Sequence, residues 1–306
     1  MTAWIKNIFS EGDIFLETEK NTLAYDAQGI IKGIVKKTLS NEFHENMPKG
    51  AILRELTQNQ YHQINWETPY YQKEIAKFLQ DTDRSKPILD IGCGDGRFTK
   101  ILVDLGFEKI VCLDSDYRLL SSLNTHAKEL GFREKLCIIH ADADELPFNH
   151  ETFSAILAIG VLYYLNENQK NAIENIYRLL INNGVFILSE PEIEGMMFRT
   201  LVFENLDATI EILEARLFKE SQGDSTFKFQ IKSKKELQTI IEHSGFSVED
   251  YHGITMFQNI LRIMLVRGLV SQSEIEKNYS KLKSLFDFLH EEGSLFKHII
   301  WKCRKI

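Results

Sequence analysis

Residues 86–191 alternate short apolar runs with stretches of helical periodicity, and this alternation constrains the fold more than any other feature of the chain. The apolar runs are PILDIG, KIVCLD, KLCIIHAD, FSAILAIG and GVFILSEP, each of the length of a buried strand. Helices between such strands are typical of a parallel sheet that is covered on both faces. The pattern therefore predicts an α/β, doubly wound fold with a mostly parallel sheet.

The residues ahead of this alternation predict two smaller segments. Residues 1–47 are rich in β-forming side chains and turn formers, which predicts a small β-rich N-terminal cap of two or three short strands. Residues 48–85 turn helical in pattern, and Thr68 before Pro69 fits an N-cap followed by proline at the first helical position. We expect residues 48–85 to form a helical lid segment.

Residues 86–306 predict one large domain with two helical insertions. The strand and helix alternation breaks at residues 192–232 and again at residues 253–293, and we expect both insertions to cap the substrate. Between and after them, FSVEDYH and FKHIIWKCRKI read as two further strands, which brings the predicted sheet to seven. Capping boxes mark two helix starts, at Ser233 with Glu236 and at Ser271 with Glu274.

In the stretch ILDIGCGDG, the first strand of the main domain, ILDI, is followed by a glycine-rich loop, GCGDG. Ligands of doubly wound sheets bind at the carboxyl ends of the strands, so this loop predicts a ligand site. NAD and S-adenosylmethionine are the two candidates, but the spacing here differs from the GxGxxG pattern of NAD-binding loops. Asp90 comes just ahead of the glycines and Asp95 lies between two of them. Carboxylates repel a pyrophosphate but attract an ammonium or sulfonium cation. The loop therefore favours S-adenosylmethionine.

The same loop resembles the signature of the class I S-adenosylmethionine-dependent methyltransferases, and ADADELPF and FSAILAIGVLYYL resemble later motifs of that family, in the expected order. The resemblance, to the type 11/25-like small-molecule group, implies a Rossmann-like methyltransferase fold. It implies that Asp114 takes the ribose hydroxyls, that Asp142 accepts from the adenine amino group, and that Ala143 offers its amide. Asp114 also fits a helix N-cap, and Asp142 an Asx-turn. The expected cofactor-binding residues are Asp90, Gly92, Cys93, Gly94, Gly96, Asp114, Ser115, Asp142, Ala143 and Gly160.

Candidate catalytic residues lie where an acceptor would meet the methyl group. Glu190 ends the fifth strand, and Tyr163 follows the fourth strand. His62 stands in an aromatic-rich stretch that precedes the main domain. A base is required only for a poor nucleophile, because alignment and water exclusion supply most of the acceleration. Packing remains the alternative role for Tyr163, and a structural role for His62.

The composition of the chain limits the kinds of partner that we expect it to bind. The net charge of −8 argues against a surface that neutralises many phosphates, so no nucleic-acid partner is expected. The four cysteines have no CxxC pair or nearby histidine at ligand spacing, which predicts no metal site and reduced thiols. No signal peptide is evident, and the apolar run from Met256 is broken by Arg262 and Arg267, so we expect a cytoplasmic protein without membrane insertion.

These features predict an S-adenosylmethionine-dependent methyltransferase acting on a small molecule, by O- or N-methylation, including in natural-product or specialised metabolism. One alternative is a methyltransferase of protein or RNA. Another is a non-catalytic partner subunit that binds the cofactor. The oligomeric state stays open between monomer and homodimer.

Overall fold

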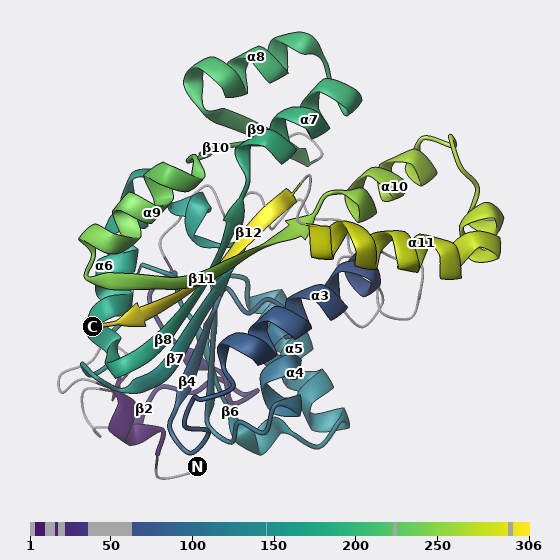
Figure 1. The fold of residues 1–306 in the computed structure, drawn as a ribbon. Helices are drawn as coiled ribbons and strands as arrows, with labels where there is room; N and C mark the ends of the chain where they lie inside the picture. Colours follow the sequence, from purple (N-terminus) through teal and green to yellow (C-terminus); the bar gives the residue numbers. More distant parts are fainter. Residues whose placement is uncertain are drawn as a thin grey trace.

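An eight-stranded, mostly parallel sheet forms the centre of the molecule, and helices pack on both of its faces (Figure 1). In sheet order its strands are β11 (Phe246–Thr255), β12 (Phe296–Lys305), β8 (Leu180–Pro191), β7 (Phe153–Ile159), β4 (Ile88–Ile91), β5 (Ile110–Asp114), β6 (Leu136–His140) and β3 (Ile31–Lys32). β12 runs antiparallel to β11 and to β8, and the other strand pairs of this sheet are parallel. The predicted α/β, doubly wound fold is confirmed. The computed structural model describes residues 4–9, 16–17, 22–35, 63–144, 146–222, 225–292 and 296–306.

The prediction of seven strands was wrong, because β3 of the N-terminal segment joins the main sheet as an eighth. Ile31 pairs with Ile139 and Lys32 with His140, in parallel. Ile31 is fully buried, so the short strand covers the otherwise open edge of β6. Two residues are too few to produce a strand periodicity in the sequence. Elsewhere in this segment β1 (Leu16–Glu17) and β2 (Thr22–Leu23) form an antiparallel pair.

Each face of the sheet has its own hydrophobic core. One core lies under α3 (Gln63–Phe78), α4 (Arg97–Asp104), α5 (Tyr117–Glu129), α10 (Phe257–Val266) and α11 (Gln272–Glu292). The other lies under η1 (Lys6–Ile8), α6 (Gln169–Leu179) and α9 (Lys234–His243). Every residue of β4, β5 and β7 is buried, which explains why these strands read as unbroken apolar runs. Short 3-10 turns, η2 (Arg133–Lys135) and η3 (Leu162–Asn168), complete this part of the chain.

The predicted N-cap at Thr68 was wrong. α3 already includes Gln63, so Thr68 and Pro69 lie inside the helix. An internal proline removes one backbone hydrogen bond and costs about 3 kcal/mol. Burial of Trp66 and Tyr70 on this helix offsets that cost, since burying a large apolar side chain contributes about 1.5–3 kcal/mol. Thr68 instead accepts a hydrogen bond from Arg97 Nε at 3.0 Å.

Both insertions leave the sheet at its carboxyl-terminal edge (Figure 1). The first consists of α7 (Ile193–Phe203) and α8 (Leu206–Ala215), followed by a hairpin of β9 (Leu217–Gln222) and β10 (Ser225–Gln230) that the sequence did not predict. The second consists of α10 and α11, which connect β11 to β12. Among the described residues, no helix combines the length and the apolar character needed to cross a membrane.

Candidate active site

The glycine loop between β4 and α4 adopts a backbone that suits glycine alone. The φ angles of Gly92, Gly94 and Gly96 are 67°, 55° and 99°. A Cβ on Gly92 would lie 2.2 Å from Val161, and one on Gly96 would lie 2.5 Å from Leu123. At Gly94 the nearest atom would be 3.9 Å away. Packing therefore requires the outer two glycines, whereas the middle one leaves room beside the loop backbone.

Asp114 connects the end of β5 to this loop. The amide of Gly94 donates to Asp114 Oδ2 and the amide of Asp116 donates to Oδ1, both at 2.8 Å. The alternative role of Asp114 as the helix N-cap is excluded, because the N-cap of α5 is Asp116, which accepts from the Arg118 amide. The structure thus places Asp114 against the glycine loop, and its role in binding the ribose hydroxyls stays a prediction.

Three carboxyl groups crowd the loop. Asp90 is buried in β4 and accepts a hydrogen bond from Thr99 Oγ1 at 2.7 Å. Burial raises the pKa of Asp90 and of Asp95 to about 7, and the charge of Asp114 adds to both shifts. Cys93, within the loop, is also buried. A pyrophosphate would add charge of the same sign, whereas an ammonium or sulfonium group would stabilise the ionised carboxylates. These residues therefore fit S-adenosylmethionine rather than NAD.

The remaining predicted cofactor residues follow the carboxyl ends of neighbouring strands. Asp142 is buried just beyond β6, and its amide donates to Ile34 of the N-terminal segment at 3.0 Å. Ala143 comes next and is partly exposed. Ser115, after β5, accepts a hydrogen bond at its carbonyl from His140, and Gly160, after β7, has a φ of 70°. The structure thus brings these positions to one edge of the sheet.

Glu190 and Tyr163 lie at the ends of β8 and β7. Glu190 is 5% exposed, and Gln169 Nε2 donates to its Oε2 at 2.8 Å. Burial raises the pKa of Glu190 to about 8, although Lys232 and the hydrogen bond from Gln169 oppose the shift. At neutral pH this carboxyl is therefore mostly protonated and can donate a hydrogen bond. The buried Tyr163 ring lies 4.6 Å from the ring of Phe229 in the first insertion.

His298, at the start of β12, is a candidate that the sequence analysis missed. Its Nδ1 lies 3.4 Å from Ser189 Oγ, and a Cβ on Gly160 would lie 3.7 Å from its Cε1. Burial, and then the cations Lys297 and Arg97, lower the pKa of His298 to about 3, so the imidazole is neutral. The polar residue within the apolar FKHII strand is the local signal that could have identified it.

Strand pairing separates His298 from Glu190. His298 pairs with Pro191, one residue beyond Glu190, so the two side chains project from opposite faces of the sheet. His298 is on the face covered by α3 and α4, next to the glycine loop. The third sequence candidate, His62, lies outside the described residues.

Arg97 ties α3 to the glycine loop. It is the first residue of α4, and its guanidinium lies 3.8 Å from Glu67 and over the ring of Tyr71, at 5.2 Å. Lys297 Nζ lies 3.2 Å from the same Glu67 carboxylate. Charged groups therefore hold α3, the glycine loop and the start of β12 together.

Comparison with known proteins agrees with this geometry. Residues 89–188 match the family model described as "Methyltransferase domain". The ubiquinone/menaquinone biosynthesis C-methyltransferase UbiE of Blochmanniella floridana is 22% identical over 248 residues, which cover 78% of this chain and 93% of that protein. The probable tRNA methyltransferase 9B of Homo sapiens is 28% identical over 152 residues, which cover 48% of this chain and 30% of that protein.

A solved structure supports the same fold. The geranyl diphosphate methyltransferase in complex with S-adenosylmethionine superposes with a TM-score of 0.55 at 13% identity, covering 86% of this chain and 95% of that one. The family match includes all of β4 except its first residue, the glycine loop and Asp114, and these residues form the carboxylate-lined site. Residues 89–188 therefore form a methyltransferase domain within a Rossmann-like fold, and the chain is an S-adenosylmethionine-dependent methyltransferase.

Proposed function

We propose that the chain methylates an oxygen or nitrogen atom of a small molecule. The observation that carries the proposal is the enclosure of the carboxyl ends of β7 and β8. Here Tyr163 and Glu190 are buried, and the first insertion adds Phe218 and Phe229 to the same apolar cluster. A compact acceptor is compatible with side chains packed this closely, whereas a folded macromolecule would have to present one extruded group.

His298 and Glu190, which project from opposite faces of the sheet, have separate proposed roles. The cofactor supplies an electrophilic methyl group, so the protein needs only to align the acceptor and exclude water. The neutral His298 imidazole is placed to accept a hydrogen bond from an acceptor hydroxyl or amine and so to orient it. The proton passes to solvent, because an imidazole with a pKa of about 3 is too weak a base to hold it at neutral pH. Glu190 and Tyr163 orient the acceptor, and His62 remains a sequence-based candidate.

The comparisons support the substrate class only in part. Some relatives are named for tRNA and others for ubiquinone and menaquinone biosynthesis. The alignment spans nearly all of UbiE but less than a third of the human tRNA methyltransferase relative. Together with the net charge of −8, this favours a small-molecule acceptor without nucleic acid, in the cytoplasm. Monomer and homodimer remain equally compatible with the proposal.

Calorimetry and methyl transfer test the proposal at two levels. We expect the chain to bind S-adenosylmethionine and not NAD in isothermal titration calorimetry. Incubation with methyl-labelled S-adenosylmethionine and a metabolite extract should label a small molecule, whereas label appearing only in RNA or protein would refute the small-molecule assignment. His298→Ala should slow transfer by roughly 10–100-fold, as loss of one orienting hydrogen bond does, at unchanged cofactor affinity.

Asp114→Ala tests the cofactor site itself. Loss of the carboxylate removes charge-assisted hydrogen bonds, so S-adenosylmethionine affinity should fall by about 1–3 kcal/mol in calorimetry. Asp104→Ala is the matched control, because Asp104 is exposed at the end of α4 and pairs only with Lys100 among the described contacts. Equal affinity of the two variants would mean that Asp114 serves the loop backbone alone.

A further inference from the structure

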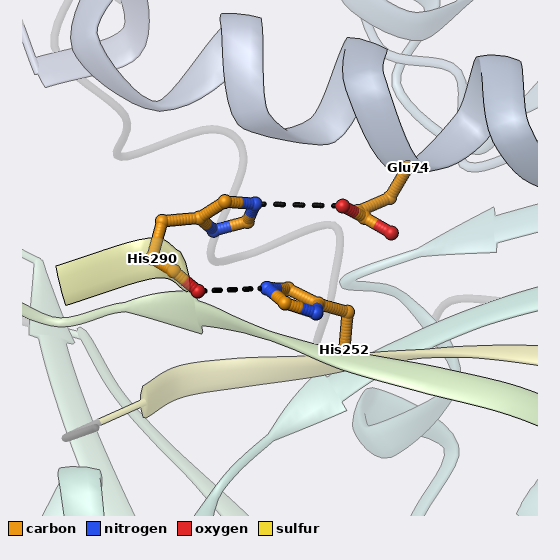
Figure 2. Close-up of side chains that lie close together, drawn as sticks. All are labelled: Glu74, His252 and His290. Atoms are coloured by element: carbon orange, nitrogen blue, oxygen red, sulfur yellow. Dashed lines mark hydrogen bonds and ion pairs between the residues drawn. The ribbon is translucent and has the colours of Figure 1, made fainter. Parts of the chain in front are cut away.

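A carboxylate and two imidazoles meet on the face of the sheet covered by α3. Glu74 of α3, His252 of β11 and His290 of α11 each bring one ligand atom within 4.8 Å of the others (Figure 2). Glu74 is 3% and His290 is 1% exposed, and His252 is partly buried. The three residues come from segments that are far apart in the sequence, so their meeting is a property of the fold.

The protein groups around this cluster leave it incompletely satisfied. Glu74 Oε1 lies 3.4 Å from His290 Nε2, an ion-pair distance. Glu74 Oε2 and both ring nitrogens of His290 are buried and accept or donate no hydrogen bond among the described residues. Burying a carboxylate with half of its oxygens unpaired is costly unless a charge satisfies it. A cation between the three side chains would remove that cost.

His252 has the surroundings of a metal-binding histidine. Its Nε2 lies 3.0 Å from the backbone carbonyl of His290. A carbonyl only accepts hydrogen bonds, so Nε2 carries the proton and Nδ1 keeps a lone pair. Histidines that bind metals commonly donate their second ring N–H to a backbone carbonyl in this way, which fixes the tautomer. Lys77, a nearby cation, is engaged by Asp250 at 2.8 Å.

We propose that Glu74, His252 and His290 bind one divalent transition-metal ion, with Zn²⁺ as the best fit. Two imidazoles and one carboxylate match zinc sites that keep a fourth position for water, and imidazole disfavours Mg²⁺ and Ca²⁺. Tetrahedral Zn²⁺ with bonds of about 2.0–2.1 Å separates its ligand atoms by about 3.4 Å. Glu74 Oε1 and His290 Nε2 already lie 3.4 Å apart, and the ion would draw the His252 ring closer from a spacing of at most 4.8 Å.

The ion would connect α3 to α11 of the second insertion and so stabilise their packing. Glu74 is two turns from Glu67 on α3, so both carboxylates project from the same side of the helix. Glu67 contacts Arg97 beside the glycine loop. A metal that joins α3 to β11 and α11 therefore fixes the element that carries Glu67 and Tyr71 to the cofactor site. This role is one of positioning and adds no step to methyl transfer.

Metal titration of the full chain tests the proposal. After chelator treatment and buffer exchange, we expect one equivalent of Zn²⁺ to bind in calorimetry, and Co²⁺ to give the visible absorption of a tetrahedral site. Glu74→Gln and His252→Asn should each weaken Zn²⁺ binding by at least about 100-fold. His243→Ala is the matched control, since His243 is exposed on α9, and it should bind like the parent chain.

Circular dichroism of each variant separates loss of a ligand from loss of the fold. Zn²⁺ binding that is equal in all four proteins, or absent from the parent chain, would overturn the proposal. If a variant fails to fold, anomalous diffraction of the parent protein at the zinc edge decides the matter independently. A peak between the three side chains supports the site, and a peak elsewhere refutes it.

Discussion

At the scale of the residue, substitutions of Gly92 and Gly131 by alanine distinguish the cost of backbone strain from the cost of overpacking. Both have positive φ, 67° and 75°, but a Cβ would meet Val161 at 2.2 Å in the first case and nothing within 4 Å in the second. Gly131→Ala should cost about 1–2 kcal/mol of unfolding free energy from strain alone. Gly92→Ala should cost roughly 1–3 kcal/mol more from overpacking. Denaturant unfolding measures both, and equal costs would contradict the packing argument.

Ionisation of Glu190 should lower the free energy of unfolding as the pH rises. Its pKa is raised from 4.5 to about 8 in the folded chain, chiefly by burial. Between these values the folded state holds a proton that the unfolded state has released, so stability falls as pH increases. Glu190→Gln keeps the shape without the charge and should gain roughly 2–4 kcal/mol over the parent at pH 8.5. Denaturant unfolding at pH 4.5 and 8.5 measures the difference, which should vanish at the lower pH.

Prediction of single site residues from the sequence worked best where the pattern involves residues that are adjacent in the chain. The glycine loop and Asp114 were identified because they directly follow apolar strands. His298 and the cluster of Glu74, His252 and His290 were missed, since strand pairing and helix packing bring their partners from distant segments. The absence of a metal site was inferred from local spacing, which contains no information about such contacts.

At the scale of the element, Ser233 should stabilise α9 from its first turn. Its hydroxyl accepts from the Glu236 amide, and the Glu236 carboxylate accepts from the Ser233 amide at 2.7 Å. Ser233→Ala removes one of these bonds and should cost about 1 kcal/mol. Ser280→Ala, at an exposed position within α11, should be neutral or slightly stabilising because alanine favours helices. Thermal unfolding of both variants measures the contrast.

The elements that the sequence predicted are those with strong internal patterns. The five main strands and both capping boxes, including the one at Ser271, are present as expected. The hairpin of β9 and β10 was missed because LFKESQ does not alternate apolar and polar residues along the chain. The start of α3 was misplaced because burial of its aromatic side chains outweighs an internal Pro69.

At the scale of the whole molecule, the glycine loop and both insertions gather at one edge of the sheet. The glycine loop, the ends of β7 and β8, and both insertions all lie at the carboxyl ends of the parallel strands (Figure 1). Doubly wound sheets bind ligands at this edge because strand order reverses there, here between β4 and β7. The sheet thus positions the glycine loop, and both insertions begin at the same edge.

Charge over the whole molecule should distinguish a small-molecule enzyme from an RNA-modifying one. The chain has 36 Lys and Arg against 44 Asp and Glu. Two lysines of the basic run at residues 232–235 already interact with other groups of the protein. Lys234 Nζ lies 3.5 Å from the Tyr251 ring centroid, and Lys232 is near Glu190. Binding to phosphates depends on released counterions, so an acidic surface gains little from it.

We therefore expect no saturable binding of bulk tRNA below about 10 μM protein at 150 mM salt, measured by fluorescence anisotropy. Lys234→Ala should leave that result unchanged, because its ammonium is already placed over Tyr251. Lowering the salt to 50 mM should raise any residual binding only slightly, since few phosphates are neutralised. Sub-micromolar binding that weakens steeply with salt would instead identify an RNA surface and redirect the search for the acceptor to nucleic acid.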